Sequence, residues 1–149
     1  MTEDALDQLW RDEFAWINAQ GIRPVRFLAA PEGVWSPIIE TVAKRYFLLT
    51  RCSMDSYNAA LPQYPMYVKE PTQGSTSVET VKAWVDTAKA NHYMICLLMH
   101  GIYPDGNTGG WYDQTSFDAL IDYIHAQGMP VITPTQLWGY LDMPLPLDF

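Results

Sequence analysis

Tyr93-Met94-Ile95-Cys96-Leu97-Leu98-Met99 (residues 93–99) is an uninterrupted apolar run that ends at His100. A stretch of turn-forming residues, Gly-Ile-Tyr-Pro-Asp-Gly at 101–106, follows at once. Such a run predicts a strand that is buried on both faces of a parallel sheet. The carboxyl ends of these strands are where α/β sheets and barrels place their ligands and chemistry. His100 is therefore the first candidate functional residue, and the alternative is a histidine that only caps a loop.

The composition predicts one globular domain over residues 1–149. The chain has 48% hydrophobic and 17% charged residues, which excludes intrinsic disorder. Its net charge of −8, with nine Lys and Arg residues in all, argues against nucleic acid as a partner. No apolar stretch is long enough to span a bilayer. The acidic start Thr2-Glu3-Asp4 does not resemble a secretory signal peptide, and the localisation stays open.

Helix and strand patterns alternate along the chain. Capping residues, apolar periodicity and glycine or proline breaks predict five helices. The first two run over about 2–20 and 38–45, and the other three begin at Thr76, Thr115 and Thr133. The predicted strands are 25–29, 46–50, 93–99 and 130–133, and the stretch 55–73 is predicted as a long loop. This alternation predicts an α/β fold with parallel strands. The four strands can form an open four-stranded parallel sheet or part of a (β/α) barrel.

Several short blocks resemble the polysaccharide deacetylase family, which includes chitin and peptidoglycan deacetylases. Residues 27–36, Phe-Leu-Ala-Ala-Pro-Glu-Gly-Val-Trp-Ser, resemble its third block, usually F-R-x-P-Y-G. Residues 97–100, Leu-Leu-Met-His, resemble its last block, L-x-H, and 51–57 are similar to the block D-x-x-D-W. The closing helix, short strand and Thr135-Gln136-Leu137 also fit the family's ending. The resemblance covers nearly the whole chain and implies the C-terminal portion of a deacetylase-like (β/α) barrel.

The blocks that hold the metal in this family have no counterpart here. The family opens with T-F-D-D-G and continues with H-S/T-x-x-H. This sequence has no Asp-Asp pair, and its three histidines, His92, His100 and His125, are scattered and do not form the second pattern. We therefore expect no cofactor in the isolated chain, whereas a complete family member holds a divalent metal, usually zinc. A partial barrel exposes its inner face and an edge strand, so we expect a homo-oligomer or a complementary deacetylase portion as partner.

The resemblance also assigns roles to individual residues. His100 would be the general acid that protonates the departing group, and Asp55 would orient it and keep it charged. The backbone N–H of Glu32 would lie in the oxyanion hole, within the turn formed with Pro31 and Gly33. Leu98 and Tyr57 would form the wall of the pocket for the acetyl group. Trp35 is a further predicted substrate-binding residue. Ala29 stands where the family has an arginine, Glu32 where it has tyrosine, and Tyr57 where it has tryptophan.

Two functions follow from these observations. The first is a hydrolase portion, similar to polysaccharide deacetylases and carbohydrate esterases, that removes acetyl groups from an acetylated polysaccharide when the barrel is complete. The alternative is a catalytically inactive glycan-binding or assembly module derived from a deacetylase. Members of this family usually act outside the cell or at the envelope. The absence of the family's metal ligands predicts that the isolated chain binds no stoichiometric zinc.

Overall fold

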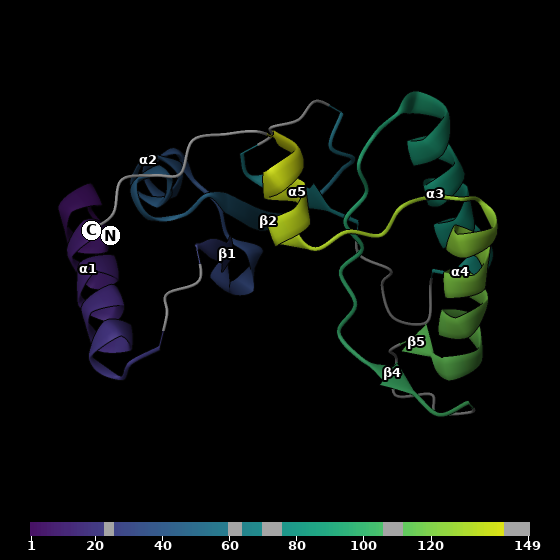
Figure 1. Cartoon of the computed structure of the whole chain (residues 1–149), viewed down its shortest axis with the longest axis horizontal. Coiled ribbons are helices and arrows are strands. Elements are labelled where there is room, and N and C mark those ends of the chain that lie inside the picture. The colour runs from purple at the N-terminus through teal and green to yellow at the C-terminus, as the bar shows by residue number, and fades with distance from the viewer. Residues whose placement is uncertain (23–25, 60–63, 70–75, 106–111, 142–149) are drawn as a thin grey trace. The chain divides into compact units, whose positions relative to one another are not determined.

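The computed structural model describes residues 1–22, 26–59, 64–69, 76–105 and 112–141 (Figure 1). The chain divides into two compact units. The first unit comprises Met1–Cys52, Tyr64–Met66 and Thr133–Phe149, and the second comprises Ser53–Gln63 and Tyr67–Ile132. The prediction of one domain over the whole chain stays a prediction.

The described residues of the first unit include three α-helices whose starts follow from the sequence. They are α1 (Glu3–Ala19), α2 (Pro37–Tyr46) and α5 (Pro134–Leu141). Thr2 caps α1 by accepting a hydrogen bond from Ala5 N (3.3 Å), and Ser36 caps α2 by accepting one from Ile39 N (3.3 Å). These predicted helices are confirmed because the capping side chains satisfy N–H groups that lack helical partners.

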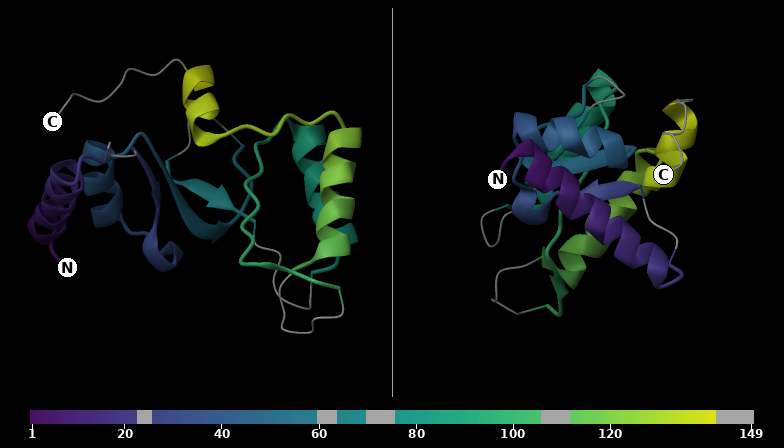
Figure 2. Two further views of the ribbon diagram at one scale, coloured as in Figure 1. Left: turned by 60° about the horizontal axis from the view of Figure 1, so that its bottom comes forward. Right: turned by 90° about the vertical axis from the view of Figure 1, so that its left-hand side faces the viewer.

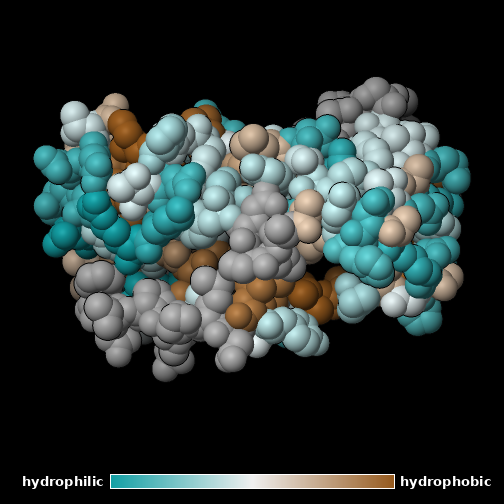
Figure 3. Space-filling model, turned by 90° about the horizontal axis from the view of Figure 1, so that it is seen from above, coloured by the Kyte–Doolittle hydropathy of each residue, from teal (hydrophilic) through white to brown (hydrophobic). Residues whose placement is uncertain are grey.

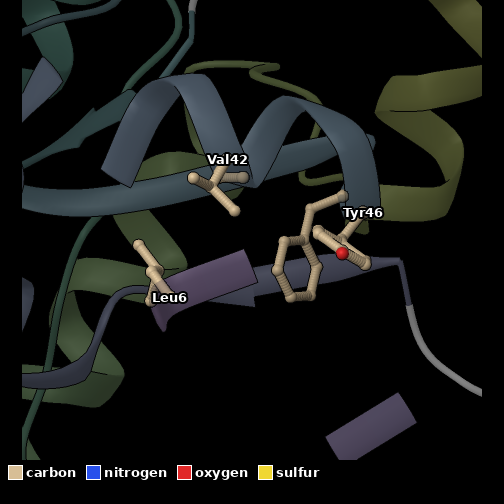
Figure 4. Packing of buried hydrophobic residues seen from close by; sticks show 5 residues of the cluster. Leu6, Val42 and Tyr46 are labelled. Carbon is tan, nitrogen blue, oxygen red and sulfur yellow. The ribbon is translucent and has the colours of Figure 1, made fainter. Parts of the chain in front are cut away.

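The core of the first unit lies between α1 and α2. Leu6 of α1 faces Val42 and Tyr46 of α2 (Figure 4), and all three are less than a tenth exposed. Aromatic rings extend this cluster, because the Trp10 ring meets the Phe47 ring edge-on at 5.2 Å. Helix α1 therefore packs on α2 through an apolar face, whereas Leu9 of the same helix is 44% exposed.

A hydrogen-bonded carboxylate, Asp7, joins α1 to α2 beside this core. It accepts hydrogen bonds from Arg11 Nε (2.8 Å), Tyr46 Oη (2.9 Å) and Arg45 Nη1 (3.1 Å), and its side chain is 14% exposed. The hydrogen bonds from Arg11 and Tyr46 hold the pKa of the Asp7 carboxyl below its ordinary value of 3.8. Asp7 thus stabilises the folded unit in its ionised form.

We predict that Asp7→Asn removes part of the acid sensitivity of folding. A lowered folded-state pKa contributes stability that is present above the unfolded value and is lost as pH falls through the folded value. Urea unfolding of both proteins at about pH 6 and about pH 3 measures this. The wild type should be the more stable protein at the higher pH, and its advantage should shrink at the lower one. A difference that does not change with pH would contradict the role of Asp7.

A three-stranded sheet has the order β1-β2-β3, with strands β1 (Phe27–Ala29), β2 (Leu49–Asp55) and β3 (Met66–Val68). Strands β1 and β2 are parallel, and Phe27 is in register with Leu49. The strand predicted over 46–50 is wrong in its bounds, because Tyr46 ends α2 and β2 continues to Asp55. The apolar run 46–49 fits a helix end as well as a strand. Strand β3 lies within the stretch that the sequence predicted as loop.

The second unit contains the neighbouring helices α3 (Val78–Asn91) and α4 (Gln114–Ala126), which lie side by side and run in the same direction in Figures 1 and 2. Val81, Val85 and Leu120 form its buried core. Two short strands, β4 (Ile102–Tyr103) and β5 (Tyr112–Asp113), pair in parallel. The apolar stripe predicted from Thr76 onward is therefore confirmed by the burial of Val81 and Val85.

Three details of the second unit differ from the sequence prediction. Ser77 caps α3 in place of Thr76, and Asp113 caps α4 in place of Thr115, since each oxygen reaches the N–H three residues ahead. The run 93–99 is not a continuous strand and is only half-buried, with bridges at Met94 and Leu97. Its described partner segments, at 58 and 69, pair with it in opposite directions, which prevents one regular ladder.

The last predicted strand, 130–133, is also wrong, because these residues have no regular structure and Val131 is 80% exposed. The helix predicted after it is confirmed. Thr133 Oγ1 accepts from Gln136 N (3.2 Å), and Gln136 Oε1 accepts from Thr133 N (2.8 Å), which is a reciprocal capping box.

The described residues thus form a mixed α/β fold with small parallel sheets. Several large apolar side chains reach the surface, and Figure 3 shows hydrophobic residues among hydrophilic ones on one face. Trp16, 60% exposed, is an example. The predicted self-association stays a prediction. None of the helices in the described part of the chain has the length and apolar character needed to cross a membrane.

Candidate functional site

Asp55 lies at the carboxyl end of β2, where its side chain is 70% exposed. Its carboxylate Oδ1 is 3.1 Å from the ammonium Nζ of Lys69. Lys69 is therefore a cationic neighbour of the predicted site residue Asp55, and no sequence pattern indicated it. Lys69 directly follows β3, in a stretch predicted as loop, where a single lysine normally faces solvent.

The Lys69 side chain is held on more than one side and is only 12% exposed. Its ammonium lies 4.7 Å from the centroid of the Tyr57 ring and 4.9 Å from the centroid of a Trp84 ring. Trp84 belongs to α3, so Lys69 joins the β2 end to this helix. The negative ring faces and the Asp55 carboxylate compensate the ammonium for lost hydration. We call Asp55, Tyr57, Lys69 and Trp84 the Lys69 cluster.

The backbone of Lys69 pairs with the segment that leads to His100. Its N–H donates to Cys96 O (2.8 Å), and its carbonyl accepts from Leu98 N (3.0 Å), which makes a parallel bridge around Leu97. His100 follows two residues after Leu98 and is exposed. The structure therefore brings Asp55, Tyr57 and Leu98, three residues predicted from the sequence, together around Lys69.

A buried amide, Asn58, holds the other end of the same segment. Its backbone N and O both pair with Met94 at 3.0 Å. Its side chain donates from Nδ2 to Tyr67 O (3.0 Å) and accepts at Oδ1 from Tyr67 N (2.8 Å), while only 1% of Asn58 is exposed. Asn58 thus fixes β3 and the 93–99 run in one arrangement, on which the position of the Lys69 cluster depends.

We predict that Asn58→Ala destabilises the chain by about 1–3 kcal/mol, because the Tyr67 N–H and carbonyl lose their buried partner. Urea unfolding measures the loss. Asn58→Asp is the sharper variant, because a buried carboxylate accepts from Tyr67 N but cannot donate to Tyr67 O. Repulsion between oxygens raises the pKa of such a carboxyl, so its stability deficit should be smaller below about pH 4 than at neutral pH. Equal stability of the three proteins would show that Asn58 is not buried in this network.

The glycine-containing loop after His100 uses its two acidic residues to cap α4. Asp105 accepts from Thr115 N (3.0 Å) and Thr115 Oγ1, and Asp113 accepts from Ser116 N (2.7 Å) and Ser116 Oγ (2.8 Å). The hydrogen bond from the Ser116 backbone N–H lowers the pKa of the Asp113 carboxyl. Tyr112 N also donates to Gly101 O (3.2 Å), which ties the residue next to His100 to β5.

Four other predicted site residues belong to the first unit. Pro31, Glu32 and Gly33 form a single 3₁₀ turn after β1, in which Gly33 N donates to Ala30 O (2.8 Å). Glu32 has φ of 54°, the left-handed conformation that non-glycine residues rarely adopt. Trp35 packs with its ring centroid 5.9 Å from that of Tyr64, beside the core cluster.

The described residues do not fit a zinc site. Within the part of the chain that the structure describes, no three His, Cys, Asp or Glu side chains gather in a group that could hold a metal ion. His92 ends α3 in a left-handed conformation, and His125 is exposed near the end of α4. The prediction that the isolated chain binds no zinc stays a prediction.

Comparisons with protein-family models, with curated proteins and with solved structures give no match for this chain. The family resemblance therefore rests on the sequence blocks alone.

Proposed function

We propose that this chain is the C-terminal portion of a polysaccharide deacetylase-like hydrolase, in which it supplies the general acid. The observation that carries the proposal is the meeting of two sequence blocks at Lys69. Asp55 contacts the Lys69 ammonium, and Leu98, two residues before His100, bonds to the Lys69 carbonyl. These blocks are more than forty residues apart in sequence, and both of them contact Lys69.

The exposure of the two proposed groups supports access by a polymeric substrate. His100 is exposed, and 70% of the Asp55 side chain is exposed, so neither is a core residue with a purely structural role. An imidazole changes charge near neutral pH and can give up a proton without a large energetic cost. The Asp55 carboxylate contacts Lys69 through Oδ1, and a carboxylate can accept through its second oxygen as well.

In the proposed reaction, water adds to the acetyl carbon of an acetylated sugar, and the bond from that carbon to the sugar nitrogen or oxygen breaks. The proton that the water loses passes to a base on the complementary deacetylase portion, and the His100 imidazolium gives its own proton to the departing atom, so that the products are acetate and a free amine or hydroxyl. Asp55 orients the imidazolium in this proposal.

Acetate release tests this function. The chain is combined with a metal-binding deacetylase portion, either as a second polypeptide or as an upstream segment of the same one, and is given acetylated chitin and peptidoglycan fragments. The proposal expects acetate release that neither part gives alone. Glycan binding without acetate release under any combination would favour the alternative, an inactive glycan-binding module.

A further inference from the structure

We propose that Lys69 is a positioning residue that holds Asp55 in place relative to the segment leading to His100. This inference rests on the proposed function, since Asp55 and His100 take their roles from it. Lys69 lies outside every block of the family resemblance. Its side chain contacts Asp55, while its backbone pairs on both sides of Leu97.

The two members of the ion pair differ in how firmly they are held. The Lys69 side chain is 12% exposed and lies against the rings of Tyr57 and Trp84, whereas the Asp55 side chain is 70% exposed. A side chain as exposed as that of Asp55 ordinarily samples several rotamers. The cation is therefore the fixed partner, and the carboxylate takes its orientation from the cation.

The backbone of Lys69 also holds the segment that precedes His100. The bonds from Lys69 N to Cys96 O (2.8 Å) and from Leu98 N to Lys69 O (3.0 Å) fix the chain just before His100. A single residue thus sets both the direction of the Asp55 carboxylate and the path of the general-acid segment. Misplacing a catalytic group by about 1 Å can cost up to about a hundredfold in rate, so such a link has a measurable effect.

The first test measures the orientation of Asp55 directly, in the chain itself and without any activity. Three-bond NMR couplings report the χ1 rotamer of Asp55 in the wild type, Lys69→Met and Lys69→Arg. The methionine keeps the apolar stem between the rings but removes the charge, while arginine keeps the charge and stacks on aromatic faces. We expect one dominant Asp55 rotamer in the wild type and Lys69→Arg, and averaged couplings in Lys69→Met.

Lys82→Met is the matched control. Lys82 also pairs with a carboxylate, Glu79 (3.1 Å), and lies 5.5 Å from the centroid of the Tyr123 ring, but it does not belong to the Lys69 cluster. Its replacement should leave the Asp55 couplings unchanged. Lys69→Gln provides a second uncharged variant if the methionine variant does not fold. Unchanged Asp55 couplings in a folded, uncharged Lys69 variant would overturn the inference.

The second test uses the assembly that releases acetate. Lys69→Met should lower kcat about tenfold and leave KM within about twofold, because the substrate contacts remain while the acid is misplaced. Lys69→Arg should recover most of the loss. Full turnover in Lys69→Met, in an assembly that His100→Ala inactivates, would overturn the inference and leave the proposed function standing. An assembly that never releases acetate would instead remove the proposed function, while the NMR couplings still decide whether Lys69 orients Asp55.

Discussion

Replacing His100 by alanine is expected to lower the turnover of the complete assembly on acetylated sugar by about a hundred- to ten-thousand-fold. Alanine cannot protonate the departing atom, whereas the residues that contact the substrate remain in place. KM should therefore change little, which separates the loss of an acid from the loss of binding. Acetate assays under steady-state conditions, with kcat and KM determined separately, measure the effect.

His125→Ala is the control for this experiment. His125 is also exposed, but it lies near the end of α4 and has no place in the proposed site. Its loss should leave kcat unchanged. Asp55→Asn is expected to cost less than His100→Ala, because the acid itself remains. Acetate release that survives His100→Ala would remove this residue from the mechanism. Unchanged glycan binding by His100→Ala, with no acetate release in any assembly, would identify the chain as a binding module.

Local signals predicted the helices well because capping is a contact within a few residues. Ser36 Oγ accepts from Ile39 N, and Thr133 Oγ1 accepts from Gln136 N, so each capping side chain satisfies a helix N–H three residues ahead. The caps of α3 and α4 differ from the predicted ones by one and two residues, because Ser77 and Asp113 stand that close to threonines, which are also common capping residues. Sequence order alone does not decide between neighbouring capping residues.

The strands were predicted less well because their pairing depends on distant residues. The run 93–99 is apolar enough for a central strand, yet it pairs at one end with Asn58 and at the other with Lys69, in opposite directions. Nothing inside the run encodes these partners. The α/β class is nevertheless shown, and the choice between part of a barrel and an open sheet stays a prediction.

The same reason explains why Lys69 was missed. A lysine in a proline-containing stretch is normally solvated, and the feature that buries this one is the pair of rings of Tyr57 and Trp84, which come from two other parts of the chain. Asp55 and Leu98 were found because short blocks carry their resemblance to a family. A residue outside those blocks becomes a candidate only when the fold places it against them.

Leu120→Ala is expected to destabilise the second unit by about 2–5 kcal/mol. Leu120 of α4 is fully buried and packs with Val81 and Val85 of α3, so its truncation removes apolar contacts and leaves a cavity between the two helices. Urea unfolding followed by circular dichroism measures the loss.

Ile121→Ala on the same helix is the matched control, because Ile121 is 46% exposed and its truncation should cost only about 0.5 kcal/mol. Trp84, which holds Lys69, lies on α3 between Val81 and Val85. Packing of α4 on α3 therefore supports the helix that positions the Lys69 cluster, and Leu120→Ala should also increase amide hydrogen exchange at Leu98, whose N–H bonds to Lys69. Equal stability of the Leu120 and Ile121 variants would show that the two helices do not share this core.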